Sequence, residues 1–493
     1  MKKILKGIVC SVTMLFALPV IASATYTPTE DVTLQNDLNE AIVIEEGKNI
    51  TINLNGHNIT VTDEDAISNH GTLIIKGSGN VKSNKGVIVN YPGATATLDN
   101  GSYLSTGWYT IKNMGVMTIN NMNFINEVNN GSSLVANGFY GNLNTDRQQK
   151  YSGKEVKLTI NGGTFENKMK SCNVIKNDDY GTLIINGGTF ISNSSMSDNG
   201  NPVVQNWNKA TINGGTFTSN NGVAIANGAL DQVADIGELT INGGTFTGTK
   251  GLFGTNGAAK KDLGVLTIND GIFNGDATVS TLYEIIINGG TFDNKVAANE
   301  EDGYDTYKDL DSDKYVVAKE EELTNSVSRN LIKEADVDSA ELALIKKALD
   351  GKTIAAFYNI DLFKTVDGIK VDQVIEADGE VVVTLSIPTD LEAVKDGYTR
   401  TYYIVRVHDG KTDILDVTDN GDGTISFKTD KFSTYALAYN DTKTASTTKA
   451  ANTNAIKNPK TLDKALIYTT IFMVSAIAFY LCFRYVKKKL ESE

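Results

Sequence analysis

Two adjacent acids, Asp178 and Asp179, are candidates for catalysis. They lie in the stretch NDDYG at 177–181. Two carboxylates can serve as acid and base in glycoside hydrolysis, and a carboxylate-bound cation beside a basic residue can support elimination from a uronate. Both reactions need partner groups. Between residues 25 and 300 the single arginine is Arg147, and no basic, histidine-containing motif accompanies the acids. We therefore predict a solvated turn here and no catalytic residues.

Metal-binding patterns are incomplete in this sequence. Residues 309–320 (DLDSDKYVVAKE) place acids at positions 1, 3, 5 and 12 of a calcium loop, but Lys314 stands where a glycine makes the bend. The stretch TDNGDGTI at 418–425 lacks the first ligand and predicts a hairpin turn. His57, His70 and His408 are far apart in the sequence. We expect neither a metal ion nor another cofactor.

Aromatic side chains are the best candidates for contact with a ligand, because their rings can stack on sugar rings. The segment 126–155 is rich in Gly and Asn, interrupts the regular pattern of the chain and is predicted to project as a loop. The aromatic candidates near it are Trp108, Tyr109, Phe139, Tyr140 and Tyr151. Packing of the loop on its own domain is the alternative role for these rings.

An eight-residue motif recurs through the first 300 residues and indicates the elements that must position these groups. LTINGGTF occupies 158–165 and 239–246, and close variants begin at residues 183, 210 and 285. The alternation of apolar and polar residues in LTI is typical of a strand with one buried face. The two glycines predict a sharp bend with positive φ, after which the phenylalanine returns to the core. One repeat is a strand, a corner and a second strand.

The spacing of the repeats predicts a parallel β-helix over residues 25–300. Most intervals between corner asparagines are 19–29 residues, which is too short to bury an apolar face without stacking on a neighbour. The leucine-rich pattern is missing, and a propeller blade needs about 40 residues or more. In a β-helix, equivalent side chains form ladders and columns. The expected asparagine ladder is Asn120, Asn161, Asn186, Asn213, Asn242, Asn269 and Asn288, and the expected phenylalanine column is Phe124, Phe165, Phe190, Phe217, Phe246, Phe273 and Phe292.

The repeat pattern stops near residue 300. Residues 301–351 predict a charged linker with one amphipathic helix at 338–349, which Asp338 and Glu341 cap and Gly351 ends. Short strand-like segments separated by turns fill 352–440 and predict a small antiparallel β-sandwich. The expected fold class is therefore all-β.

The N-terminal end predicts export of the chain. Basic residues at 2, 3 and 6 precede an apolar run at 8–18, and Ala-Ser-Ala at 22–24 offers a cleavage site, so 1–24 is expected to be a signal peptide. Of the three cysteines, only Cys172 lies between the signal peptide and the C-terminal apolar span, so we expect no internal disulfide. The formal charge of −14 argues against nucleic acid as a partner.

The C-terminal end predicts attachment to a membrane. Residues 465–483 carry no charge, and a helix of this length nearly matches a hydrocarbon core of about 30 Å. The basic tail at 484–493 favours the cytoplasmic side, which leaves the preceding domains outside the cell. Residues 441–457 are rich in Thr, Ala, Lys and Asn without apolar periodicity, and we expect a disordered spacer.

The spacer is followed by NPKTLD at 458–463, and the order of this motif, the apolar span and the basic tail resembles the cell-wall sorting signal of Gram-positive surface proteins. The resemblance implies that a sortase reads Asn458, Pro459, Thr461 and Leu462, cleaves after Thr461 and transfers the chain to peptidoglycan. Asn458 stands where Leu is commoner, and Leu462 stands where Gly is usual. A plain membrane anchor is the alternative.

The Asn-Gly-Gly-Thr-Phe coils resemble right-handed β-helix surface proteins of Firmicutes, and the segment FKTDKFSTYALAY at 427–439 resembles a small β domain that precedes their wall anchors. The resemblance implies an extracellular, wall-anchored adhesin or recognition protein that binds a glycan or a host matrix. β-Helices also include pectate lyases and polygalacturonases, so a polysaccharide-degrading enzyme is one alternative. A structural stalk without a specific ligand is another.

Overall fold

The computed structural model describes residues 25–107, 109–126, 133–139, 153–168, 172–194, 202–228, 237–254, 264–277, 283–391 and 393–444. The expected signal peptide, most of the spacer, the sorting motif, the apolar span and the basic tail lie outside these residues. Among the described residues, no helix is long and apolar enough to cross a membrane.

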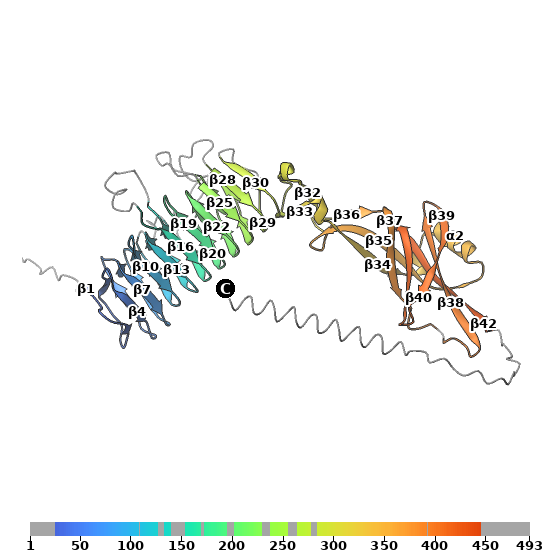
Figure 1. Ribbon diagram of the computed structural model, residues 1–493, viewed down its shortest axis with the longest axis horizontal. Coiled ribbons are helices and arrows are strands. Elements are labelled where there is room, and N and C mark those ends of the chain that lie inside the picture. Colours follow the sequence, from blue (N-terminus) through green and yellow to red (C-terminus); the bar gives the residue numbers. More distant parts are fainter. Residues whose placement is uncertain are drawn as a thin grey trace, which may run out of the picture. The chain divides into compact units, whose positions relative to one another are not determined.

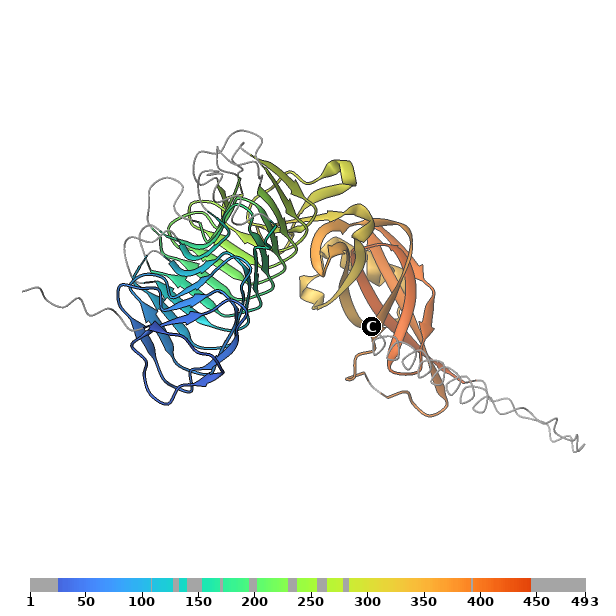
Figure 2. The same ribbon diagram turned by 60° about the vertical axis from the view of Figure 1, so that its left-hand side comes forward.

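The repeats form a parallel β-helix whose coils each contribute to three sheets (Figures 1 and 2). Sheet A contains, in order, β1 (Thr25–Tyr26), β3 (Ala41–Ile44), β6 (Ile67–Asn69), β9 (Ile88–Asn90), β12 (Tyr109–Asn113), β15 (Ser133–Asn137), β18 (Asn173–Asn177), β21 (Val204–Asn206), β24 (Ile225–Asn227) and β27 (Phe253–Gly254). Sheet B contains β2 (Val32–Thr33), β4 (Asn49–Asn53), β7 (Thr72–Lys76), β10 (Thr95–Leu98), β13 (Val116–Ile119), β16 (Lys157–Ile160), β19 (Thr182–Ile185), β22 (Lys209–Ile212), β25 (Gly237–Ile241), β28 (Gly264–Ile268) and β30 (Glu284–Ile287).

Sheet C follows the glycine corner of each coil. It contains β5 (Ile59–Val61), β8 (Asn80–Ser83), β11 (Ser102–Ser105), β14 (Asn123–Asn126), β17 (Thr164–Asn167), β20 (Thr189–Ser192), β23 (Thr216–Ser219), β26 (Thr245–Gly248), β29 (Ile272–Asn274) and β31 (Gly290–Phe292). The antiparallel hairpin of β32 (Tyr304–Lys308) and β33 (Tyr315–Lys319) continues this sheet, because β33 pairs with β31. The acids at 309–313 thus lie in the turn of a hairpin.

The predicted ladder and column are both present. Each corner asparagine from Asn161 to Asn288 donates its side-chain amide to the corner asparagine of the preceding coil over 2.8–3.1 Å. The seven phenylalanines are fully buried, and successive rings stack with centroids 4.7–5.0 Å apart. In-register pairing of strands such as β16 and β19 brings these equivalent residues together.

The prediction that both corner glycines need positive φ is wrong for the first of them. Gly163 has a φ of +112°, whereas Gly162 has an ordinary negative one. A Cβ at Gly163 would also lie 2.4 Å from the Met122 carbonyl oxygen, compared with 3.0 Å between a Cβ at Gly162 and the Asn120 carbonyl oxygen. The second glycine therefore makes the bend, and the first allows close approach to the neighbouring coil.

A second asparagine ladder, which sequence analysis missed, is buried at the end of sheet A. Each side-chain amide donates to the next asparagine along the chain over 2.7–2.8 Å and also to backbone carbonyls at the corner between sheets A and B. The members are Asn69, Asn90, Asn113, Asn137, Asn177, Asn206 and Asn227. This ladder satisfies polar backbone groups that water cannot reach.

Two sheets form the domain that follows. Sheet F contains β34 (Thr324–Ile332), β35 (Thr353–Val366), β42 (Thr434–Lys443), β38 (Tyr398–His408) and β39 (Lys411–Leu415), with β36 (Ile369–Val374) paired to β35; sheet G contains β37 (Glu376–Ser386), β41 (Thr424–Lys431) and β40 (Val417–Asp419). Apolar residues of both sheets, among them Ile404 and Val383, share one buried cluster. The expected linker thus includes the hairpin β32–β33 and β34, and the TDNGDGTI segment connects antiparallel β40 and β41, as predicted.

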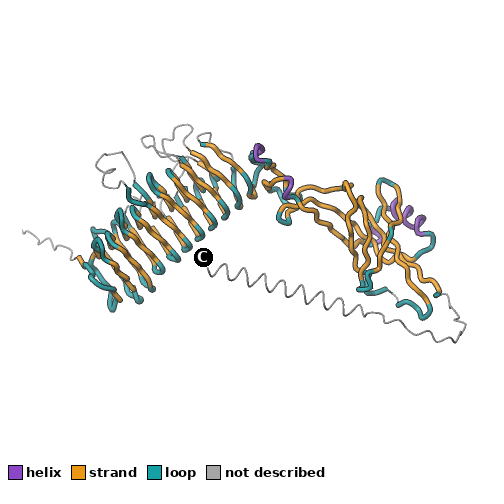
Figure 3. Tube along the Cα trace, in the orientation of Figure 1, coloured by secondary structure: helices purple, strands orange, loops and turns teal. Residues whose placement is uncertain are grey.

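The described helices are short and follow the stack of coils (Figure 3). They are η1 (Glu300–Asp302), η2 (Glu320–Glu322), η3 (Glu334–Asp336) and α2 (Ser339–Leu349). Asp338 caps α2 by accepting from the backbone N–H groups of Ala340 and Glu341, and Asp350 at its C-terminal end has a φ of +46°. Helix α2 buries Ile345 and Leu349 against sheet F.

The two ladders predict unequal effects of losing one asparagine. Asn206→Ala should lower the free energy of unfolding by about 3 kcal/mol, because it leaves the buried Asn227 side-chain oxygen without its donor and the buried Asn177 amide without its acceptor in the ladder. Asn213→Ala, in the exposed ladder, should cost about 1 kcal/mol or less. Denaturant unfolding of the two variants measures the difference, and equal losses would contradict the assigned role of the buried ladder.

Candidate functional site

Two lysines lie on the outer side of sheet A, at the same register position. Lys112 of β12 pairs with Ala136 of β15, which pairs with Lys176 of β18. Their neighbours Ile111 and Ile175 face the core, so the lysine side chains point to the opposite side of the sheet. Because Ala136 is small, the two long side chains can approach each other above it.

Asp178 joins these lysines into one cluster. Its carboxylate lies 3.3 Å from the Lys112 ammonium and 3.0 Å from that of Lys176. The alternation of strand side chains explains the placement, since Asp178 follows Lys176 by two residues. We call Lys112, Lys176, Asp178 and Asp179 the lysine-aspartate cluster.

The acids of this cluster are buried, so the prediction of a solvated turn is wrong. Asp178 is 0% and Asp179 2% exposed, and Lys176 is 4% exposed. Removing such charges from water costs several kcal/mol for each ion even when they are paired. Buried charges outside a hydrophobic core are typical of functional sites, although structural ion pairs also occur.

Aromatic rings surround the cluster. The Lys176 ammonium lies 4.3 Å from the centroid of Trp207, and the Lys112 ammonium lies 5.2 Å from that of Tyr109. Such contacts stabilise a cation that has lost part of its water. The site is therefore both charged and aromatic.

Phe139 and Tyr180 adjoin the cluster through the backbone of Asp179. The Phe139 N–H donates to the Asp179 carbonyl over 3.0 Å, and the rings of Phe139 and Tyr180 meet edge to face at 6.2 Å. Tyr180 is 46% exposed and has a φ of +63°, a strained conformation for a residue with a large side chain. An exposed ring held in this way can contact a ligand.

Two of the five predicted contact residues, Tyr109 and Phe139, are thus brought to one cluster and are partly exposed. The remaining predicted residues, Trp108, Tyr140, Tyr151, Asn458, Pro459, Thr461 and Leu462, lie outside the described residues. Sequence analysis missed Lys112, Lys176 and Trp207. Only the register of the coils joins Lys112 to Asp178, which is 66 residues away.

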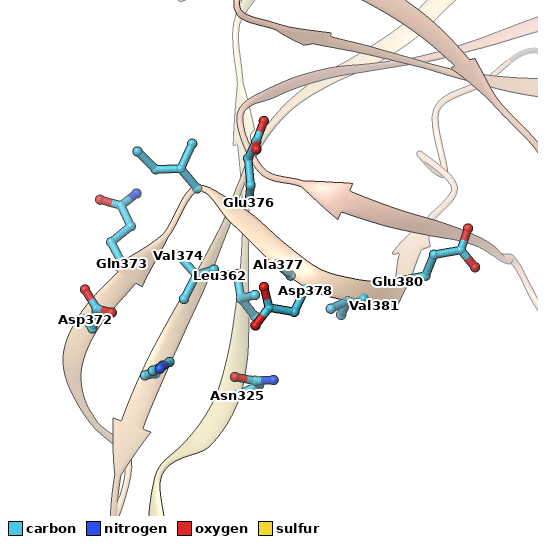
Figure 4. A pocket seen from close by; sticks show the side chains of 13 residues that line it. Asn325, Leu362, Asp372, Gln373, Val374, Glu376, Ala377, Asp378, Glu380 and Val381 are labelled. Atoms are coloured by element: carbon cyan, nitrogen blue, oxygen red, sulfur yellow. The ribbon is translucent and has the colours of Figure 1, made fainter. Parts of the chain in front are cut away.

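A second polar region lies in the two-sheet domain. A hollow of about 680 Å³ is lined by Asn325, Asp372, Asp378 and Glu380, among others. Figure 4 shows Asp378 and Asn325 on one side of β37 and the Glu376 carboxylate turned away from them. The hollow has acids and one lysine, Lys364, but no aromatic ring among its lining residues. Without an aromatic ring, this hollow is less suited to binding a sugar than the lysine-aspartate cluster.

Comparisons of the chain with protein-family models, with curated proteins and with solved structures gave no match.

The charge balance of the cluster can be tested with one substitution. Asp178→Asn should lower the free energy of unfolding by about 3–5 kcal/mol, because the buried ammonium of Lys176 and the largely covered one of Lys112 lose their shared carboxylate. Adding Lys176→Met to this variant should restore part of the loss. Denaturant unfolding is the measurement.

The matched control is Glu238→Gln. Glu238 also pairs with a lysine of the adjacent coil, Lys209, over 3.4 Å, but both side chains are more than half exposed. The control should leave stability nearly unchanged. If Asp178→Asn also left the free energy of unfolding unchanged, the ion pairs of Asp178 would not contribute to the stability of the fold.

Proposed function

We propose that this chain is an extracellular recognition protein attached to the bacterial cell wall, and that it binds a glycan or matrix ligand through the outer side of sheet A. The single observation that carries the proposed binding is the conjunction of a buried lysine-aspartate cluster with the partly exposed rings of Tyr109, Phe139 and Tyr180. Rings supply apolar contact with sugar faces, and Lys112, whose side chain is 15% exposed, can donate to hydroxyl groups.

The proposed attachment rests on the chain ends. The signal peptide at 1–24 exports the chain, and the sorting signal at 458–463 delivers it to a sortase, which transfers Thr461 to peptidoglycan. A parallel β-helix followed by a two-sheet domain is consistent in architecture with the resemblance to Firmicutes surface proteins. The parallel β-helix and the two-sheet domain support this proposal at the level of architecture.

A polysaccharide lyase or hydrolase is the second candidate, and the position of Asp178 and Asp179 beside two lysines favours it. A general base must reach the proton that it removes. Asp178 is fully buried and already binds two ammonium groups, so it is poorly placed for that role. Recognition without turnover therefore agrees better with the geometry, and a stalk without ligand is the third candidate.

Glycan binding can be tested at the exposed ring of Tyr180. Tyr180→Asn removes the ring and keeps a residue that tolerates positive φ. We expect glycan-array binding about tenfold weaker than wild type, which corresponds to about 1.4 kcal/mol. Tyr398→Asn is the control, since Tyr398 is 41% exposed but lies in the two-sheet domain.

The same experiment separates the three candidates. A wild-type chain that binds no glycan or matrix protein would favour the stalk. Reducing ends or unsaturated products released from a polysaccharide panel would favour the enzyme. Equal binding by Tyr180→Asn and wild type would place the contact surface elsewhere.

The sorting signal predicts a covalent product. Wild-type protein should leave the cell wall only after muralytic digestion and should end at Thr461 in mass spectra of wall fragments. Thr461→Ala should remain in the membrane fraction with residues 462–493 attached, because the residue whose carbonyl the sortase attacks is no longer recognised. Extraction of intact wild-type chain by detergent alone would show that the segment is a plain membrane anchor.

A further inference from the structure

Three potential metal ligands meet in the two-sheet domain. His408 is the last residue of β38, Asp409 begins the turn to β39, and Glu376 is the first residue of β37. Glu376 belongs to sheet G, whereas His408 belongs to sheet F. The three side chains therefore connect the two sheets at one edge.

The ligand atoms lie close to one another. His408 Nε2 is 3.2 Å from Glu376 Oε1 and 3.8 Å from Asp409 Oδ2, and the three ligand atoms all lie within 4.8 Å of one another. The His408 side chain is 7% exposed, whereas those of Glu376 and Asp409 are 55% and 85% exposed. The buried imidazole of His408 thus lies beside two exposed carboxylates, whose side chains can change conformation.

These separations agree with coordination of one small cation. Zinc binds imidazole nitrogen and carboxylate oxygen at about 2.0–2.2 Å. Ligand atoms around such a tetrahedral ion are then about 3.3–3.6 Å apart. The 3.2 Å between His408 Nε2 and Glu376 Oε1 is close to this range. Asp409, at a hairpin tip, must move toward the other two ligands by up to about 1 Å, because the three ligand atoms lie within 4.8 Å of one another. Imidazole with carboxylates suits zinc better than calcium, which prefers oxygen alone.

We propose that Glu376, His408 and Asp409 form a binding site for a divalent transition-metal ion of the zinc type, which ties β37 of sheet G to the end of β38 in sheet F. This site is independent of the proposed ligand surface on the β-helix. With three protein ligands and an exposed side, it leaves a coordination position for water.

Lys431 is the competitor for this site. Its ammonium lies 3.2 Å from Glu376 Oε1. Hydrogen bonding and charge from Lys431, followed by the charge of His408, lower the pKa of Glu376. The Lys431 side chain is 36% exposed and can turn away when a cation binds Glu376.

Zinc chloride is the probe for this site, added to the untagged full chain. We expect one zinc ion bound per chain in competition with a chromogenic zinc indicator, and a rise of the melting temperature of the two-sheet domain. His408→Gln should weaken zinc binding by at least about tenfold and abolish the rise in melting temperature. Lys431→Met should tighten zinc binding, since it removes the competing ammonium.

His57→Gln is the matched control, because His57 lies 3.6 Å from a single carboxylate, that of Asp37, in the β-helix. This variant should bind zinc as wild type does. The readout is the zinc-induced change and not the melting temperature itself, so a purely structural loss in His408→Gln does not affect the result. Absence of zinc binding, or equal binding by wild type and His408→Gln, would overturn the proposal and leave a structural ion pair.

Discussion

Each coil of the β-helix presents its strands to the next coil at a spacing of about 4.8 Å, in parallel and in register. This constraint turns a repeat in the sequence into a column in space. A phenylalanine at one corner must stack on the phenylalanine of the next coil, and an asparagine must meet an asparagine. A coil that changed its register would lose every such contact at once.

The two asparagine ladders use this constraint for different purposes. In the exposed ladder the amides donate toward the N-terminus, whereas in the buried ladder they donate toward the C-terminus. The buried amides also bind carbonyls at a corner where the backbone leaves the regular sheet pattern. Unsatisfied groups there would cost about 1–3 kcal/mol each. The buried ladder thus makes a sharp corner compatible with a dry core.

The sequence allowed prediction of those features whose residues lie together within the repeated motif. The exposed ladder and the phenylalanine column lie within the motif INGGTF, so one motif located both of them. Each member of the buried ladder ends a stretch of Ile or Val, one variable residue and Asn, such as IKN at 111–113 and 175–177 and VQN at 204–206, and this three-residue pattern is a much shorter signal than the eight-residue motif.

The lysine-aspartate cluster was harder still to predict. Lys112 and Lys176 each precede a member of the buried ladder by one position. Their equivalence in the two coils becomes visible only when that ladder has been identified. Asp178 shows that a charged residue is not necessarily exposed to solvent. Here the lysines of neighbouring strands supply the opposite charges that allow its burial. The same limit applies to His408, whose partner Glu376 comes from the other sheet of its domain.

The position of the cluster in the stack has an energetic reason. Its lysines lie on β12 and β18, and the stack of coils continues on both sides of these strands, at β9 and β21. Stability in a solenoid is approximately a sum of coil and interface contributions. A coil that holds dehydrated lysines and aspartates is less stable by itself, but intact neighbours on both sides resist its opening. A terminal coil has one neighbour and would fray first. Buried charge is therefore best accommodated in the interior coils, where this protein has it.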